Sequence, residues 1–263
     1  MHSLLRSTLF TTALALGSVT SQAAIQNANL GGTTSYDGWE NITAANNPGY
    51  PGFGDSTAWP HPIESNAAGS GDANLTKVAN GTLGAPSPLG ASVYFGGFAS
   101  NANAFGGTLG VNDATPLAGL STLLFQIEIG EGIAGYDFYN HAAPVLRINN
   151  GSAISANYFA LLSTFQSGAF DIPGDDPDLG AVPVFQNTYA YQWDIAGYLA
   201  ANPGTINSLS IEFSGAQHAQ VYALRLDQST AVWNSLAVVP EPGSPILISA
   251  AFLGLGLTLR RRR

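Results

Sequence analysis

Residues 188–229 read TYAYQWDIAGYLAANPGTINSLSIEFSGAQHAQVYALRLDQS, and this stretch decides the fold class. It opens with 188–193, which is rich in β-prone aromatic residues and predicts a strand. Asp194 then stands where its side chain can cap a short helix over 195–201. The Asn-Pro-Gly sequence at 202–204 ends that helix.

Strand patterns follow the helix and also precede it. Residues 206–215 alternate apolar and polar side chains with a period of two, and 219–229 are again rich in apolar residues. Upstream, 91–97 and 143–149 carry β-prone residues, and the second of these ends in an Asn-Asn-Gly turn. Strand, short helix, turn, strand, turn and strand are typical of the closing part of an all-β domain.

The segment 121–130 gives the clearest alternation upstream of that stretch. Its apolar residues alternate with Gln126 and Glu128, so we expect a half-buried strand with these two side chains toward solvent.

Two other segments are less regular. Tyr36, Trp39 and Ile42 mark an early strand. The spacing of large apolar residues in SANYFALLSTF, 155–165, predicts a short helix, with an apolar strand as the alternative.

Composition supports a β-sandwich for the whole body of the chain, residues 24–237. Only 10% of residues are charged, Gly (31) and Pro (15) are plentiful, and the apolar runs are short. The order of elements in 188–229 resembles the closing half of a galactose-binding-type jelly roll. That resemblance implies a jelly-roll sandwich and leaves the function open, because such folds host both binders and enzymes.

The N-terminal part of the body is expected to be rich in loops. Residues 46–62 are dense in turn-forming and aromatic residues, and we expect long loops over a core because Tyr50, Phe53 and Trp59 need burial. Residues 65–81 are expected to form a surface excursion.

Charge and cysteine content exclude several classes of function. Between residues 24 and 239 there are three basic and sixteen acidic residues, a net charge of −13. This surface disfavours nucleic acid as a partner. The chain has no cysteine, which excludes disulfides, thiol catalysis and cysteine-ligated zinc.

The N-terminus predicts an exported protein. Residues 1–23 combine Arg6, a short apolar run over 9–19 and small residues that permit cleavage after Ala23. A membrane anchor is the alternative, but the apolar run is shorter than the roughly 20 residues that span a bilayer.

The C-terminal segment 238–263 predicts a short membrane helix. Residues 244–259 carry no charge and as a helix would span about 24 Å, less than a hydrocarbon core of about 30 Å. The four arginines that follow are expected to stay in the cytoplasm, so the body lies outside. The prolines before the apolar run cannot extend this helix and leave the acidic residue between them exposed.

This tail resembles the PEP-CTERM sorting signal of Gram-negative and related bacteria. The matching residues are Pro240, Glu241, Pro242, Arg260, Arg261, Arg262 and Arg263. The resemblance implies processing by an exosortase, a membrane enzyme similar to a cysteine transpeptidase. It also implies delivery to the cell surface or to an extracellular polysaccharide matrix. A tail anchor that is never cut is the alternative.

Three sequence patterns suggest chemistry, and each has a structural alternative. Residues 130–135 match G-x-G-x-x-G, but aromatic residues and Pro144 follow where a nucleotide-binding helix is required, so we favour a β-turn or a bulge. Four carboxylates on a Gly/Pro loop predict either a calcium site or a solvated acidic loop. These are Asp171, Asp175, Asp176 and Asp178. The histidines His61, His141 and His218 lack the spacing of a zinc site.

Aromatic residues in loop-rich sequence give the candidate sugar contacts. Trp39 and Trp59 are the candidates, with burial in the core as the alternative for each. A secreted hydrolase using Glu128 and Glu131 is the least favoured hypothesis. We therefore expect an exported surface or matrix protein, not an enzyme, that is structural or adhesive or, alternatively, lectin-like. No cofactor other than calcium is expected.

Overall fold

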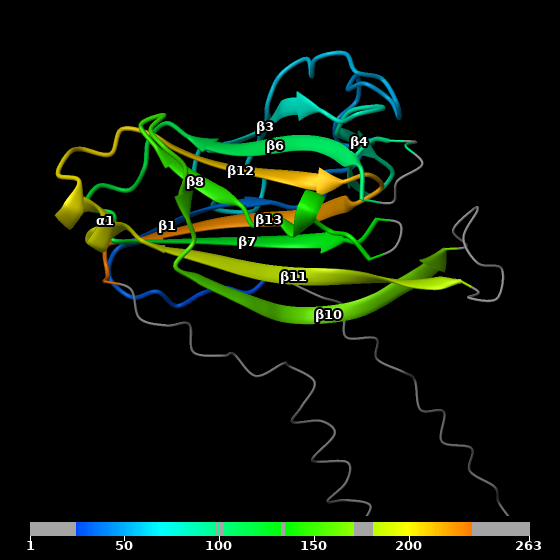
Figure 1. Cartoon of the computed structure of the whole chain (residues 1–263). Coiled ribbons are helices and arrows are strands. Elements are labelled where there is room, and N and C mark those ends of the chain that lie inside the picture. The colour runs from blue at the N-terminus through cyan, green and yellow to red at the C-terminus, as the bar shows by residue number, and fades with distance from the viewer. Residues whose placement is uncertain (1–24, 98, 100–102, 133–134, 171–180, 233–263) are drawn as a thin grey trace, which may run out of the picture.

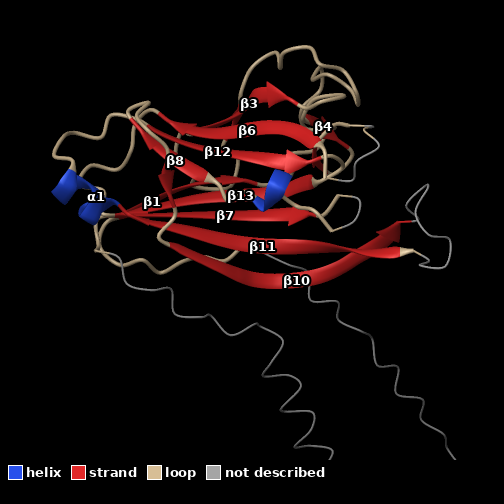
Figure 2. Ribbon diagram, viewed as in Figure 1, coloured by secondary structure: helices blue, strands red, loops and turns tan. Residues whose placement is uncertain are grey.

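The computed structural model describes residues 25–97, 99, 103–132, 135–170 and 181–232. Over these residues two antiparallel sheets pack face to face, and strands dominate (Figures 1 and 2). The prediction of an all-β sandwich is therefore confirmed. The predicted leader and the sorting tail lie outside the described residues.

The first sheet has the strand order β10-β11-β7-β13-β5-β4, and β1 also pairs with β13. Its strands are β1 (Thr34–Trp39), β4 (Ser87–Leu89), β5 (Ser92–Tyr94), β7 (Thr122–Gly130), β10 (Tyr158–Phe170), β11 (Val182–Asp194) and β13 (Gln220–Ser229). The pairing of β1 with β13 joins the two ends of the described chain within one sheet.

The second sheet has the strand order β2-β3-β6-β12-β8-β9. Its strands are β2 (Ile63–Glu64), β3 (Asn74–Asn80), β6 (Phe105–Asp113), β8 (Val145–Ile148), β9 (Ile154–Ser155) and β12 (Leu209–Ala216). Two short helical segments are also described: the 3-10 helix η1 (Tyr139–His141) and the α-helix α1 (Ile195–Ala201).

The facing sides of the two sheets form the hydrophobic core. Among its largest fully buried side chains are Trp39, Phe95, Phe125 and Trp193. Trp193 also donates a hydrogen bond from its indole to the carbonyl of Ile154, 3.0 Å away, and so ties β11 of the first sheet to β9 of the second.

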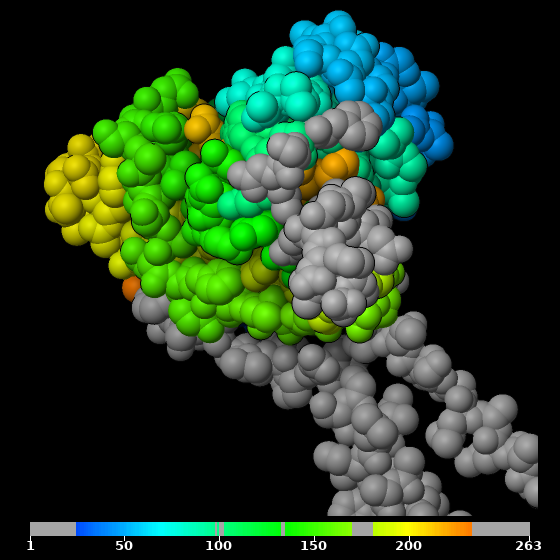
Figure 3. Space-filling model, turned by 45° about the vertical axis from the view of Figure 1, so that its right-hand side comes forward, coloured from blue at the N-terminus to red at the C-terminus, as the bar shows by residue number. Residues whose placement is uncertain are grey.

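The closing stretch folds as the sequence predicts. Asp194 caps α1, because its carboxylate accepts a hydrogen bond from the backbone N–H of Gly197 at 2.8 Å. The helix lies at one end of the sandwich, and the loops of 40–62 lie at the other (Figures 1 and 3). The predicted turn after β8 also forms, with both of its asparagines, Asn149 and Asn150, at positive φ.

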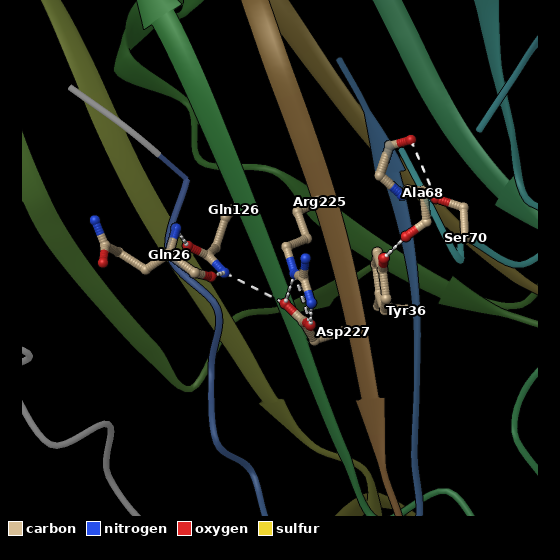
Figure 4. Close-up of polar contacts among 8 residues, drawn as sticks. Gln26, Tyr36, Ala68, Ser70, Gln126, Arg225 and Asp227 are labelled. Carbon is tan, nitrogen blue, oxygen red and sulfur yellow. Dashed lines mark hydrogen bonds and ion pairs between the residues drawn. The ribbon is translucent and has the colours of Figure 1, made fainter. Parts of the chain in front are cut away.

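The prediction of a half-buried β7 was wrong. All nine residues of this strand are buried. β7 is central in its sheet, between β11 and β13, and the N-terminal segment around Gln26 crosses the outer face of this sheet (Figure 4). The backbone N–H of Gln26 donates to the side chain of Gln126 at 2.9 Å, and that side chain donates back to the carbonyl of Gln26 at 2.7 Å. Polar side chains on this outer face are thus covered by backbone that hydrogen-bonds to them.

The helix predicted over 155–165 was also wrong, and the strand alternative is correct. Residues 158–165 belong to β10, at the edge of the first sheet, and Ser155 ends β9 of the second. A bulge between Leu161 and Ser163 shifts the register against β11. An extra residue at a bulge breaks the period-two alternation, and the remaining spacing of large apolar residues then imitates a helix.

The N-terminal half contains more strand than we predicted. Residues 74–80 of the expected surface excursion form β3, which pairs with β6 inside the second sheet. The early strand forms as β1. Tyr50 and Trp59 pack against the core as predicted, but the prediction that Phe53 is buried was wrong, because it is 36% exposed and lies edge-on to Tyr94 instead.

Candidate functional site: a hollow beside Arg225

The two tryptophans predicted to contact sugar have different environments. Trp39 is fully buried, and its indole donates to the carbonyl of Ile63 at 3.0 Å, so it presents no ring face to a ligand. That candidate is corrected to a core residue. Trp59 is half-buried, and its indole donates to the carbonyl of Pro86 at 2.8 Å. Its candidacy stays a prediction.

The metal predictions have different outcomes. The acidic residues of the calcium loop lie outside the described residues. Each of the three histidines contacts a different tyrosine: Tyr50 for His61, Tyr136 for His141 and Tyr94 for His218. In the part of the chain that the structure describes, no three His, Asp or Glu side chains gather into a metal site.

Four of the six residues of the G-x-G-x-x-G sequence are described, and none of these four lies in a helix. Gly130 ends β7, and the backbone N–H of Gly132 donates to the carbonyl of Tyr136 at 2.9 Å. A Cβ atom at Gly132 would lie 2.2 Å from the carbonyl oxygen of Gln217. This glycine therefore permits two backbone segments to approach closely. The helical segment that follows is the three-residue η1, which is too short to hold a pyrophosphate.

The carboxylates considered for a hydrolase do not face a common cleft. Glu128 accepts a hydrogen bond from the side chain of Gln186, whereas Glu131 accepts one from Asn187 at 3.2 Å. Neighbouring residues of a strand point to opposite faces of the sheet. The two glutamates are therefore held by opposite faces of β11.

A cluster of polar side chains lies where β7 and β11 meet the loop before η1. We call Glu131, Asp137, Asn187 and Tyr189 the Asp137 cluster. Asn187 donates to Asp137 at 3.0 Å, and the hydroxyl of Tyr189 donates to the same carboxylate oxygen. Burial raises the pKa of Asp137 to about 7, although both hydrogen bonds oppose that shift. This carboxyl group therefore gains and loses its proton near neutral pH.

The outer face of the first sheet carries the second polar group of interest (Figure 4). The pairing of β1 with β13 places Tyr36 opposite Asp227 and Gly38 opposite Arg225. Because Gly38 has no side chain, Arg225 extends over the neighbouring Tyr36, and its guanidinium carbon lies 3.9 Å from the ring centroid. The hydroxyl of Tyr36 donates to the carbonyl of Ala68, which fixes the ring.

Arg225 is also held by an acidic neighbour. Its Nε lies 2.8 and 2.9 Å from the two carboxylate oxygens of Asp227, and its Nη2 lies 2.8 Å from the first. Gln126 donates to Asp227 at 3.3 Å. Burial raises the pKa of Asp227, and the nearby Arg225 opposes the rise. Tyr36 and Gln126 hold the Arg225–Asp227 pair in place, and the opposite charges of the pair largely cancel.

Two depressions lie on either side of this ion pair. The larger, which we call the Arg225 hollow, has a volume of about 440 Å³ and lies between the N-terminal segment and the loop 69–71. Its lining includes Ala28, Leu30, Thr34, Tyr36, Arg225 and Asp227. The smaller has a volume of about 270 Å³ and is lined in part by Glu40, Glu128 and Arg225.

The sequence analysis predicted neither the Asp137 cluster nor the group of residues around Arg225. The sequence did contain a feature that could have drawn attention to Arg225, because it is one of only three basic residues between positions 24 and 239. Asp137 and Asn187 had no such feature, because 50 positions separate them and only the pairing of strands brings them together.

No helix in the described residues is long and apolar enough to cross a membrane. Comparison of the chain with protein-family models, with curated proteins and with solved structures found no match. The chemistry of the described residues, together with the sequence of the two ends, is therefore the basis for assigning a function.

Proposed function

We propose that this chain is an exported bacterial surface protein that is sorted and cut through its C-terminal tail. The leader 1–23 directs export, and 244–263 hold the chain briefly in the inner membrane. An exosortase-type enzyme recognises the exposed Pro240, Glu241 and Pro242 and releases the folded body to the cell surface or the matrix. The body is a jelly-roll-like module with a structural or adhesive role, and it is not an enzyme.

The observation that best supports this proposal is the pairing of the first strand with the last. β1 lies beside β13 in register from Thr34↔Ser229 to Trp39↔Leu224. The backbone N–H of Thr230 also donates to the carbonyl of Thr33 at 3.0 Å. The sheet is thus complete within residues 34–229, so removal of both ends leaves every described strand paired.

The charge of the chain supports the same proposal. Four of the eight basic residues of the chain stand directly after the apolar run of the tail, and basic residues beside an apolar segment stay on the cytoplasmic side. The body has no cysteine and therefore needs no oxidative folding outside the cell.

The test is mass spectrometry of the protein's C-terminus after expression in a Gram-negative host that carries an exosortase-type enzyme. We expect the mature wild-type chain to end near Glu241. The Glu241→Ala variant should accumulate in the membrane fraction at full length. Glu64→Ala is the matched control, since it removes an exposed carboxylate from the folded body, and it should be processed as the wild type.

Two results would contradict the proposal. Surface-located protein that retains Arg263 would identify the tail as a permanent anchor. Equal processing of the Glu241→Ala and Glu64→Ala variants would show that the Pro-Glu-Pro segment is not the recognition element.

A further inference from the structure

Arg225 carries hydrogen-bond donors that the fold does not use. The Nε and Nη2 groups are directed to Asp227, as described above. Nη1 makes no hydrogen bond with the described residues, although the side chain is only 15% exposed. Nη1 is not among the fully buried unpaired atoms, so it stays accessible to an acceptor that enters. The lining therefore has unused capacity to bind a ligand.

The Arg225 hollow has the size of a small-molecule site. Its volume of about 440 Å³ lies within the range of roughly 300 to 1,000 Å³ that is usual for ligand sites. The floor is formed by β1 and β13, two paired strands, and one wall by the N-terminal segment that Gln26 fastens to Gln126. The guanidinium is stacked on Tyr36 and paired with Asp227, so it is already oriented before a ligand arrives.

The lining selects against charged ligands. Arg225 and Asp227 neutralise each other, and the remaining lining residues are uncharged. An anion would approach a body with a net charge of −13, and a cation would meet the unused N–H groups of Arg225. A purely apolar ligand would leave those N–H groups without an acceptor.

The lining of the hollow contains both donors and acceptors. Arg225 offers N–H groups, Asp227 offers carboxylate oxygens, and the exposed hydroxyl of Thr34 can do either. Thr34 and Asp227 lie on the same outer face of the sheet, two positions apart in the β1–β13 register. A ring that carries several hydroxyl groups matches such a surface, because each hydroxyl both donates and accepts.

We propose that the Arg225 hollow binds a neutral, hydroxyl-rich ligand, namely a sugar residue of an uncharged glycan. Arg225 donates to ring or hydroxyl oxygens, and Asp227 accepts from a hydroxyl. The site is separate from the buried Trp39 and from the half-buried Trp59. It does not depend on cleavage of the tail, so failure of the sorting proposal would leave it standing.

The experiment measures binding of the full chain, purified in mild detergent, to an array of neutral glucans, galactans and xylans. Alginate and polygalacturonate serve as anionic probes. The Ala28→Trp variant fills the hollow while both residues of the ion pair are retained, and we expect it to lower the affinity for the neutral glycans at least tenfold. Asn29→Trp is the matched control, since Asn29 is the exposed next residue and does not line the hollow.

A second pair of variants tests the guanidinium itself. Arg225→Met should abolish binding. Arg147→Met, which breaks the ion pair with Glu212 on the other sheet, should not change it. The melting temperature of each variant checks that it folds. If Arg225→Met fails to fold, the comparison of Ala28→Trp with Asn29→Trp still decides the test. Absence of binding to every neutral glycan, binding to the anionic polymers alone, or equal affinity of the Ala28→Trp and Asn29→Trp variants would overturn the proposal.

Discussion

The side-chain amide of Asn187 lies 3.0 Å from the carboxylate of Asp137 and 3.2 Å from that of Glu131, so one amide bridges two acidic groups. Asp137 is 7% exposed, and its second carboxylate oxygen has no hydrogen-bond partner in the described part of the chain. A buried carboxylate with an oxygen left unpaired is costly to ionise. The Asp137 cluster therefore makes stability depend on pH.

We predict that the free energy of unfolding falls as the pH rises from about 4 to about 7. The pKa of Asp137 is about 7 in the folded chain against an ordinary value of 3.8, so the folded state binds a proton that the unfolded state has lost. The contribution of Asp137 to the free energy of unfolding is fully present below pH 3.8, and it is lost as the pH rises through about 7. At 1.36 kcal/mol per pKa unit, the loss from this group is about 4 kcal/mol.

Urea unfolding of the wild type and of Asp137→Asn between pH 4 and pH 8 tests this prediction. Asn is close in shape to the protonated acid, so the variant should lose less stability across this range. Burial also raises the pKa values of Asp37, Glu128 and Asp227, and these groups leave both proteins with some pH dependence. Parallel curves for the two proteins would show that Asp137 does not cause the effect.

Gly132→Ala should destabilise the domain by about 1 to 3 kcal/mol, the usual cost of overpacking. The added methyl group would lie 2.2 Å from the backbone oxygen of Gln217, and backbone cannot move aside as a flexible side chain can. Gly204→Ala is the control, because a Cβ atom there meets nothing within 4 Å. Thermal unfolding measures the stability of both variants. Equal melting temperatures for Gly132→Ala and Gly204→Ala would contradict the close approach of Gly132 to the backbone of Gln217.

Trp39→Ala should cost about 3 to 5 kcal/mol, as expected for a fully buried aromatic side chain. It also leaves the carbonyl of Ile63 without its indole donor. Trp59→Ala should cost less, because that ring is only half-buried. Denaturant midpoints compare the two variants. A larger loss at Trp59 would contradict the burial described here.

Asp194→Ala should destabilise the domain by about 1 kcal/mol, the typical value for a lost N-cap. The variant leaves the backbone N–H of Gly197 without the carboxylate that it contacts. Asp194→Asn keeps an oxygen in the capping position and should unfold within a few tenths of a kcal/mol of the wild type. If the Asn variant is as unstable as the Ala variant, capping is not the cause.

Leu161→Lys should reduce self-association of the protein at high concentration. Leu161 is 52% exposed on β10, an edge strand without charged residues that pairs with β11 alone among the described strands. Uncharged edges favour pairing with another chain, and a lysine opposes it. Leu83→Lys is the control, since Leu83 is equally exposed but lies outside the strands. Light scattering should show a lower mean mass for the first variant only.

The sequence by itself determined the elements whose signals are local. Alternation, caps and turns depend on residues within a few positions, so the cap at Asp194, helix α1 and strands β12 and β13 were all predicted from 188–229. The same local signals failed in β10, where the bulge at Leu161 imitates a helical period. They also failed in β7, because a strand cannot show in its own residues that a distant segment covers its outer face.

Only the tertiary structure decided which side chains meet. Tyr36 and Arg225 are separated by 189 positions, yet they stack because the first strand pairs with the last. The same pairing places Trp39 in the core, whereas the sequence alone left sugar contact and burial as alternatives for it. Strand pairing depends on the total burial that the whole chain achieves and on no single segment. The binding hollow and the Asp137 cluster are therefore properties of the assembled sandwich, while the export and sorting predictions depend on the sequence of the two ends.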